Sequence, residues 1–178
     1  MRSILILLSL LAAAPGFAAD CNYIPKTSVC GVPIDSNIAS FEKTLGAPDG
    51  TISMGKDRVG LLYGQKTLLI FWRDKLWQIH AWENNPNIDF WSYVRNSEDR
   101  INSRLIIAGW GPWGLSRAEC RNYLNQFKTI DGDQFSEVMQ LPGATLSVFY
   151  EPTFEVRVDP NDWQKYKTKH LKIQLTSK

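Results

Sequence analysis

The chain has 178 residues, with 20 basic and 18 acidic side chains and a formal net charge of +2. This length fits one compact domain or two small, closely packed modules. Charges of both signs are mixed along the sequence without a basic tail or stripe. That pattern argues against nucleic-acid binding and against electrostatic attachment to a membrane surface.

Residues 1–18 have the organisation of a cleavable export signal. Arg2 precedes an apolar run at residues 4–14, which is shorter than the roughly 20 residues of a membrane-spanning helix. Gly16 and Ala18 are small residues at the two positions that a signal peptidase recognises. We therefore expect cleavage after Ala18, a net charge of about +1 once Arg2 is removed, and a mature protein in the periplasm or outside the cell.

A lipoprotein is the alternative, because Cys21 lies just beyond the apolar run. Asp20 precedes this cysteine, where lipid attachment requires a small apolar residue. No later segment is long and apolar enough to span a bilayer. We expect neither a lipid anchor nor membrane insertion.

Three cysteines, Cys21, Cys30 and Cys120, would enter an oxidising compartment, where thiol pairs persist as disulfides. Of the three possible pairs we favour Cys21–Cys30, which would close a short polar loop and restrain the new N-terminus. Cys120 falls on the apolar stripe of a predicted helix, so we expect it to pack as a small hydrophobic residue. A catalytic or metal-binding Cys120 would need partners, and the only histidines, His80 and His170, are distant in sequence.

The first half reads as one helix followed by an antiparallel meander. Asp35 and Ser36 are its N-cap candidates, and Gly46 ends it. Branched and aromatic residues predict strands at residues 59–63, 67–73 and 76–82. Residues 83–104 form the connection to the second half.

The second half repeats this order. A short strand at 105–108 leads into a glycine-rich loop at 109–114, and Ser116 with Glu119 forms a capping box that predicts a helix to about Phe127. Strands are predicted at 135–140, 144–150, 154–158 and 171–175, with one helical turn near Trp163 and Tyr166. The fold class is therefore α+β, with two helix-plus-antiparallel-meander units packed as a two-layer α/β sandwich. We place the signal peptide at 1–18, the first unit with its connection at 19–104 and the second unit at 105–178.

The stretch Gly31-Val32-Pro33-Ile34, the helix with Ile38 and Phe41, and the turn Leu45-Gly46-Ala47-Pro48 resemble small envelope modules. Such modules occur in SmpA/OmlA-type outer-membrane assembly lipoproteins and, in tandem, in the β-lactamase inhibitor protein family. The resemblance implies a protein-binding module without catalytic activity. The second half lacks the Leu-Gly-x-Pro turn, Asp20 removes the expected lipidation, and no functional residue is carried over.

No catalytic constellation is visible, so we assign no catalytic residue, no metal ligand and no cofactor. Residues 131–133 resemble a calcium-loop fragment but lack the later ligands, which favours a plain turn. His80 is expected to be a structural or rim residue. Glu137 and Glu155 would form an acid/base pair only if the fold brought them together, and solvated sheet positions are the commoner place for such residues.

Tryptophan is the unusual feature, with seven residues in the chain. Trp72 and Trp77 lie in predicted strands, where burial is the default. We select Trp82, Trp91, Trp110 and Trp113 as candidate partner-binding residues, because aromatic side chains anchor protein interfaces. For Trp110 and Trp113, which lie in the loop, burial as packing plugs is the competing interpretation.

The leading hypothesis is a non-enzymatic periplasmic or secreted protein that binds another protein, concretely an inhibitor or an immunity protein against a toxin or envelope enzyme. It would act as a monomer or homodimer. A glycan- or peptidoglycan-binding protein is the first alternative, since exposed tryptophans also stack on sugar rings. An envelope hydrolase is the second.

Overall fold

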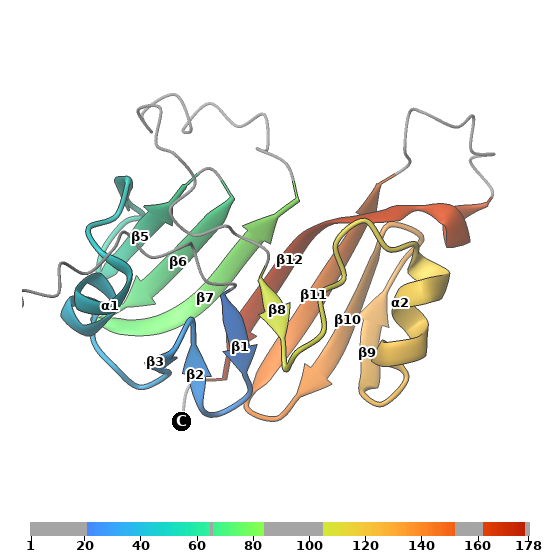
Figure 1. The fold of residues 1–178 in the computed structure, drawn as a ribbon, viewed down its shortest axis with the longest axis horizontal. Helices are drawn as coiled ribbons and strands as arrows, with labels where there is room; N and C mark the ends of the chain where they lie inside the picture. Colours follow the sequence, from blue (N-terminus) through green and yellow to red (C-terminus); the bar gives the residue numbers. More distant parts are fainter. Residues whose placement is uncertain (1–20, 65, 84–104, 152–161, 177–178) are drawn as a thin grey trace, which may run out of the picture.

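The structure is a computed structural model that describes residues 21–64, 66–83, 105–151 and 162–176. The expected export signal, the candidate Trp91, Glu155 and the predicted strand at 154–158 lie outside these residues. The described part is an α+β fold with two sheets and two α-helices, which confirms the predicted fold class at this level (Figure 1).

The larger sheet has eight strands in the order β4-β5-β6-β7-β12-β11-β10-β9, and every neighbouring pair is antiparallel. Its strands are β4 (Gly50–Ser53), β5 (Arg58–Tyr63), β6 (Thr67–Trp72), β7 (Lys75–Trp82), β9 (Lys128–Gly132), β10 (Ser136–Leu141), β11 (Ala144–Glu151) and β12 (Lys167–Leu175). Five of the predicted strands correspond to β5, β6, β7, β10 and β11 with ends shifted by one residue at most. The edge strands β4 and β9 were not predicted.

The two meanders are joined into one sheet rather than each forming a sheet of its own. β12 pairs with β11 on one side and with β7 on the other, in a register that runs from His170 opposite Trp82 to Gln174 opposite Gln78. Pairing β7 with β12 leaves neither strand as an exposed edge with unpaired N–H and C=O groups. β12 is also longer than the predicted strand at 171–175.

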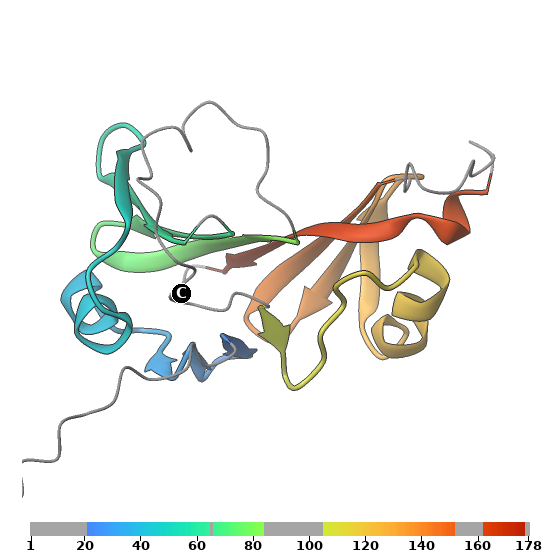
Figure 2. The ribbon, with the colours of Figure 1, turned by 45° about the horizontal axis from the view of Figure 1, so that its top comes forward.

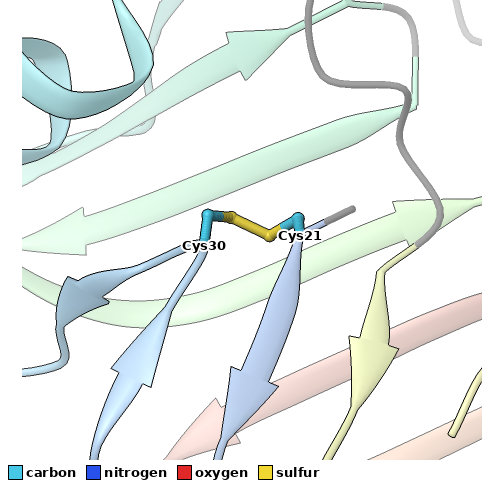
Figure 3. The surroundings of a disulfide bond; sticks show 2 residues. All are labelled: Cys21 and Cys30. Carbon is cyan, nitrogen blue, oxygen red and sulfur yellow. A yellow bond between two sulfur atoms is a disulfide. The ribbon is translucent and has the colours of Figure 1, made fainter. Parts of the chain in front are cut away.

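A smaller sheet has the order β3 (Val32–Pro33), β2 (Ser28–Val29), β1 (Asn22–Ile24) and β8 (Ile106–Ile107). β1 runs parallel to β8, so the N-terminal segment is fastened to the start of the second half. The Cys21–Cys30 disulfide is present as predicted and joins the start of β1 to the chain just after β2 (Figure 3). The loop between the cysteines is therefore a disulfide-closed hairpin.

Both predicted helices are present and begin with side-chain caps. α1 (Ile38–Leu45) is capped by Asn37, whose carboxamide oxygen accepts from the Ser40 N–H, so the prediction of Asp35 or Ser36 as N-cap is wrong. α2 (Arg117–Leu124) has the predicted Ser116–Glu119 capping box but ends three residues before Phe127. The single turn η2 (Trp163–Lys165) agrees with the prediction.

α1, the smaller sheet and α2 all lie on one side of the large sheet (Figure 2). The main core fills this interface, where Phe41 of α1 packs edge-on against Phe71 at 5.2 Å between ring centroids, and Cys120 and Leu124 of α2 are buried. On the opposite side of the sheet Leu62, Leu68 and Ile70 form a second, smaller cluster. One face of the large sheet is therefore covered by the helices and the smaller sheet, and the other face carries this second cluster.

None of the helices within the described ranges is long and apolar enough to cross a membrane.

Candidate functional site

A hollow of about 690 Å³ opens at one end of the large sheet. It lies where the β6–β7 hairpin, the β1–β2 turn, the β10–β11 turn, the end of β12 and the segment after β3 come together. We call it the tryptophan hollow, and the lining residues that matter below are Lys26, Ile34, Asp35, Trp72, Arg73, Lys75, Leu76, Trp77, Gly143 and Leu175. Trp72 is 40% exposed, an unusually large exposure for an indole.

A β-bulge directs Trp77 to this hollow. Ile70 pairs with Gln78 while Phe71 pairs with Leu76, so Trp77 is the extra residue of β7 and has no partner on β6. Its ring packs with the Leu62 cluster on the side away from the helices, and not with the main core. The expectation that Trp72 and Trp77 are buried core residues is therefore wrong. For Trp77 the reason is the bulge, which shifts the alternation of side chains by one position, and Trp72 lies at the exposed end of β6.

An arginine lies over each of these two rings. The Arg73 guanidinium carbon is 5.2 Å from the Trp72 ring centroid, and that of Arg58 is 5.0 Å from the Trp77 ring centroid. Such cation–π contacts hold the indoles in place and leave a mixed aromatic and basic surface. Tryptophan and arginine are the residues most enriched among the energetic anchors of protein interfaces.

The wall that carries Trp72 is held firmly. The hairpin turn places Arg73 and Asp74 at φ angles of 48° and 64°, in the left-handed region. The Asp74 carboxylate accepts a hydrogen bond of 3.0 Å from the Ile38 N–H at the start of α1, and the Lys75 ammonium donates to the Asp35 carbonyl at 2.6 Å. The turn is thus tied to the N-terminal end of α1, which makes the hollow largely preformed.

Gly143 and Lys26 form the opposite wall. Gly143 has a φ of 77°, and a Cβ built on it would lie 3.1 Å from the Lys26 Cγ. The aliphatic stem of Lys26 therefore lies directly over the β10–β11 turn, although Lys26 as a whole is an exposed residue. The positive φ favours glycine at this turn, and a Cβ here would require the Lys26 side chain to shift.

Trp82 lies elsewhere, on the open face at the seam between β7 and β12. Its ring stacks on His170 of β12, with 4.8 Å between ring centroids. Phe149, which pairs with His170 from β11, stacks on the same imidazole, also at 4.8 Å. The Nδ1 atom of His80 and the Nε2 atom of His170 are 3.1 Å apart, so the two imidazoles share one hydrogen bond. The rings turn their faces to one another, so this stack serves to join the two halves of the sheet.

Burial keeps both imidazoles uncharged at neutral pH. Desolvation, with a smaller contribution from the Lys172 charge, lowers the pKa of His80 to about 4. Desolvation followed by the charges of His80 and Lys172 lowers the pKa of His170 to about 3. Protonation of either ring would place a cation beside Lys172 and inside the stack.

The seam should therefore weaken in mild acid. Unfolded histidines have a pKa near 6.5, so between pH 6.5 and the folded values the unfolded chain binds more protons, and stability is lost as the pH falls. We expect the free energy of unfolding, measured in urea at pH 7, 6 and 5, to fall by up to about 1.4 kcal/mol per pH unit for each proton. The His80→Gln/His170→Gln double variant should show a flatter dependence in this range, and an equal slope in both proteins would contradict the assignment.

The structure packs the two loop tryptophans against the helix-covered side. Trp110 is half-buried and stacks on Tyr123 of α2, with 4.4 Å between ring centroids. Trp113 is also half-buried, and its indole N–H donates to the Leu105 carbonyl at 2.9 Å. Neither approaches Trp82, which packs with the cluster on the opposite face, so the candidate residues do not form one site.

A second hollow, of about 460 Å³, lies beside α2 and contains Glu137 and two aspartates. Glu137 was expected at a solvated sheet position, but it is buried. Its Oε1 accepts hydrogen bonds from Arg117 at 3.0 Å and from Arg121 at 2.9 Å. Its Oε2 accepts from the Tyr150 hydroxyl at 3.0 Å. With both carboxylate oxygens engaged in this way, Glu137 serves as a structural link between α2 and the sheet.

The two aspartates of this hollow also hold the backbone. Asp133 accepts from the N–H groups of Phe135 and Ser136, and these bonds, led by that from Phe135, lower the pKa of its carboxyl. Residues 131–133 therefore form the end of β9 and a turn, in agreement with the interpretation of a plain turn. Among the described residues, no group of three or more His, Cys, Asp and Glu side chains converges as metal ligands would.

Cys120 is buried and unpaired, as expected. Its Sγ lies 3.3 Å from the Thr168 hydroxyl, and burial raises the pKa of the thiol. A thiol that is buried and protonated is a poor nucleophile. Cys120 therefore contributes to the packing of α2 on the sheet.

Comparisons with known proteins do not identify a family. No protein-family model matches the sequence, and no curated protein matches it. Among solved structures, the chain matches a cysteine-rich secretory protein from Staphylococcus aureus subsp. aureus Mu50, with a TM-score of 0.47 and 10% sequence identity. The alignment covers 80% of this chain and 43% of that protein, so this chain spans less than half of its length.

Proposed function

We propose that this chain is a non-enzymatic, periplasmic or secreted protein-binding module of the inhibitor or immunity type, built from two helix-and-meander units. The observation that carries the proposal is the tryptophan hollow, in which the exposed Trp72 and the bulged Trp77 lie under two arginines. Large aromatic side chains in a preformed hollow bury much area at little entropic cost. The resemblance of residues 31–48 to envelope modules that bind proteins supports the same reading.

Two further observations favour this function over catalysis and support export. The carboxylate of Glu137 is engaged by arginines and a tyrosine, which leaves it poorly suited to act as an acid or base. The Cys21–Cys30 disulfide is compatible with an oxidising compartment outside the cytoplasm.

The test compares capture by two variants that each remove an exposed aromatic ring. Trp72 is 40% exposed in the hollow, and Phe135 is 46% exposed at the other half of the sheet. We expect a protein captured from the envelope extract of the producing cells by the wild type and by Phe135→Ala, identified by mass spectrometry, to be lost with Trp72→Ala. The purified pair should then associate directly, with binding weakened about 30-fold or more by Trp72→Ala, as for an interface anchor worth about 2 kcal/mol.

Equal capture by both variants would count against the hollow as the binding surface. A glycan-binding protein would behave differently, since oligosaccharides alone would change its tryptophan fluorescence in a saturable way and Trp72→Ala would abolish the change. That result would replace protein binding by the glycan alternative.

A further inference from the structure

We propose that the tryptophan hollow binds an acidic peptide segment of the partner, one that carries a large apolar side chain between its carboxylates. This inference rests on the proposed function and specifies the chemistry of the partner segment.

The charges that line the hollow are mostly positive. Lys26, Arg73 and Lys75 line it together with a single carboxylate, that of Asp35. The Lys26 ammonium has no carboxylate partner among the residues that the structure describes. Lys75 bonds to a backbone carbonyl, so its charge is not neutralised and two of its three N–H groups remain as donors.

The other acids near the rim are already bound. Asp57 pairs with Arg73, with 3.4 Å between the Oδ2 and Nε atoms, and Asp74 accepts from the first helical N–H of α1. Neither aspartate lines the hollow, and Asp57 compensates the charge of the arginine that lies over Trp72. The two lysines are therefore the cations available to a ligand, and carboxylates are their natural partners.

Between the lysines the wall is apolar. Leu76 and Leu175, together with the rings of Trp72 and Trp77, line this part of the hollow. A leucine or aromatic side chain placed here would be removed from water, which favours binding. The volume of about 690 Å³ exceeds that of one side chain, so flanking residues also fit.

The geometry thus selects a segment of the pattern acidic–apolar–acidic. Lys26 belongs to the β1–β2 turn and Lys75 to the start of β7, so the cations come from two separate elements that both border the hollow. A peptide with carboxylates on both sides of its anchor would contact both. A basic peptide would meet like charges, which disfavours it.

The experiment uses the full mature protein labelled with 15N and three capped peptides that share a central leucine. The flanking residues are Asp and Glu in the first peptide, Asn and Gln in the second, and Lys and Arg in the third. The indole N–H resonances of Trp72 and Trp77 are identified from the Trp72→Phe and Trp77→Phe variants. We expect the acidic peptide to shift these two resonances with a Kd near or below about 1 mM, and the other two peptides to bind at least about fivefold more weakly.

Two further measurements test the charge directly. Raising the salt concentration from about 25 mM to about 250 mM should weaken the acidic peptide several-fold, since exposed charges are screened over a shorter distance. Lys26→Glu should reduce its binding about fivefold or more, whereas Lys165→Glu in η2, at the opposite end of β12 from Leu175, should leave it unchanged. Unchanged urea midpoints would show that both variants fold.

Equal binding of the acidic and neutral peptides, or shifts confined to other tryptophans, would overturn the inference. If a purified protein partner still depends on Trp72 in that case, the proposed function stands and only the acidic character of its segment is wrong. If the partner is also insensitive to Trp72→Ala, both proposals fail.

Discussion

Replacing Glu137 by leucine should lower the free energy of unfolding by about 3–5 kcal/mol, the largest effect that we expect from one substitution. The side chains of Arg117 and Glu137 are only 6% and 9% exposed. Without the carboxylate, the buried Arg117 guanidinium would lose its ion pair with Glu137, and the Tyr150 hydroxyl would lose its acceptor. Equilibrium unfolding in urea, followed by tryptophan fluorescence, measures the difference.

Two variants separate this charge effect from a general loss of packing. Arg121 contacts the same carboxylate but is 42% exposed, so Arg121→Met should cost less than about 1 kcal/mol. The double variant Arg117→Met/Glu137→Leu removes both buried charges and should recover at least half of the stability lost in Glu137→Leu. A double variant as unstable as Glu137→Leu alone would contradict the account.

Opening the Cys21–Cys30 disulfide should cost about 2.5 kcal/mol of unfolding free energy, the second large effect. The bond closes a loop with a sequence separation of 9, and removing it returns chain entropy to the unfolded state. In the native state it also holds β1 and β2, which pack Tyr23 and Val29 into the main core. The Cys21→Ser/Cys30→Ser variant and the reduced wild type should therefore show the same lowered urea midpoint.

Reductant supplies the control for this prediction. It should shift the midpoint of the wild type and leave that of Cys21→Ser/Cys30→Ser unchanged, because Cys120 has no disulfide partner. A loss below about 0.5 kcal/mol would show that the hairpin is held by its core contacts alone.

The features that could be predicted from the sequence are those fixed within a few residues. The Ser116–Glu119 capping box places α2, and runs rich in branched and aromatic residues place β5, β6 and β7. The short spacing between Cys21 and Cys30 favoured their disulfide. Each of these signals is local, so no knowledge of the tertiary fold was needed.

The features that were missed depend on contacts between distant segments. β1, β2 and β3 have two or three residues each, too few for an alternating pattern, and exist because they pair with one another; β8 lies within the predicted strand at 105–108, but its parallel pairing with β1 was not predicted. The joining of β7 to β12 likewise depends on two strands that are separated by most of the second half. Nothing in either strand's own sequence specifies its partner.

The candidate site was missed for a related reason. A single bulge in β7 moves Trp77 away from the core, and the Arg73–Asp74 turn leaves Trp72 at an exposed strand end. A basic and polar hairpin turn directly after Trp72 was the available signal. The loop tryptophans attracted attention because glycine and proline surround them, but Trp113 is tied to the Leu105 carbonyl.

We propose the tryptophan hollow as the surface that contacts a partner protein. Hydrogen–deuterium exchange of the purified complex against the free protein tests it most directly, because backbone amides buried at an interface exchange more slowly. We expect added protection in the β6–β7 hairpin and the β1–β2 turn, with no change in β9. Protection confined to β9 or α2, with the hairpin unchanged, would contradict it.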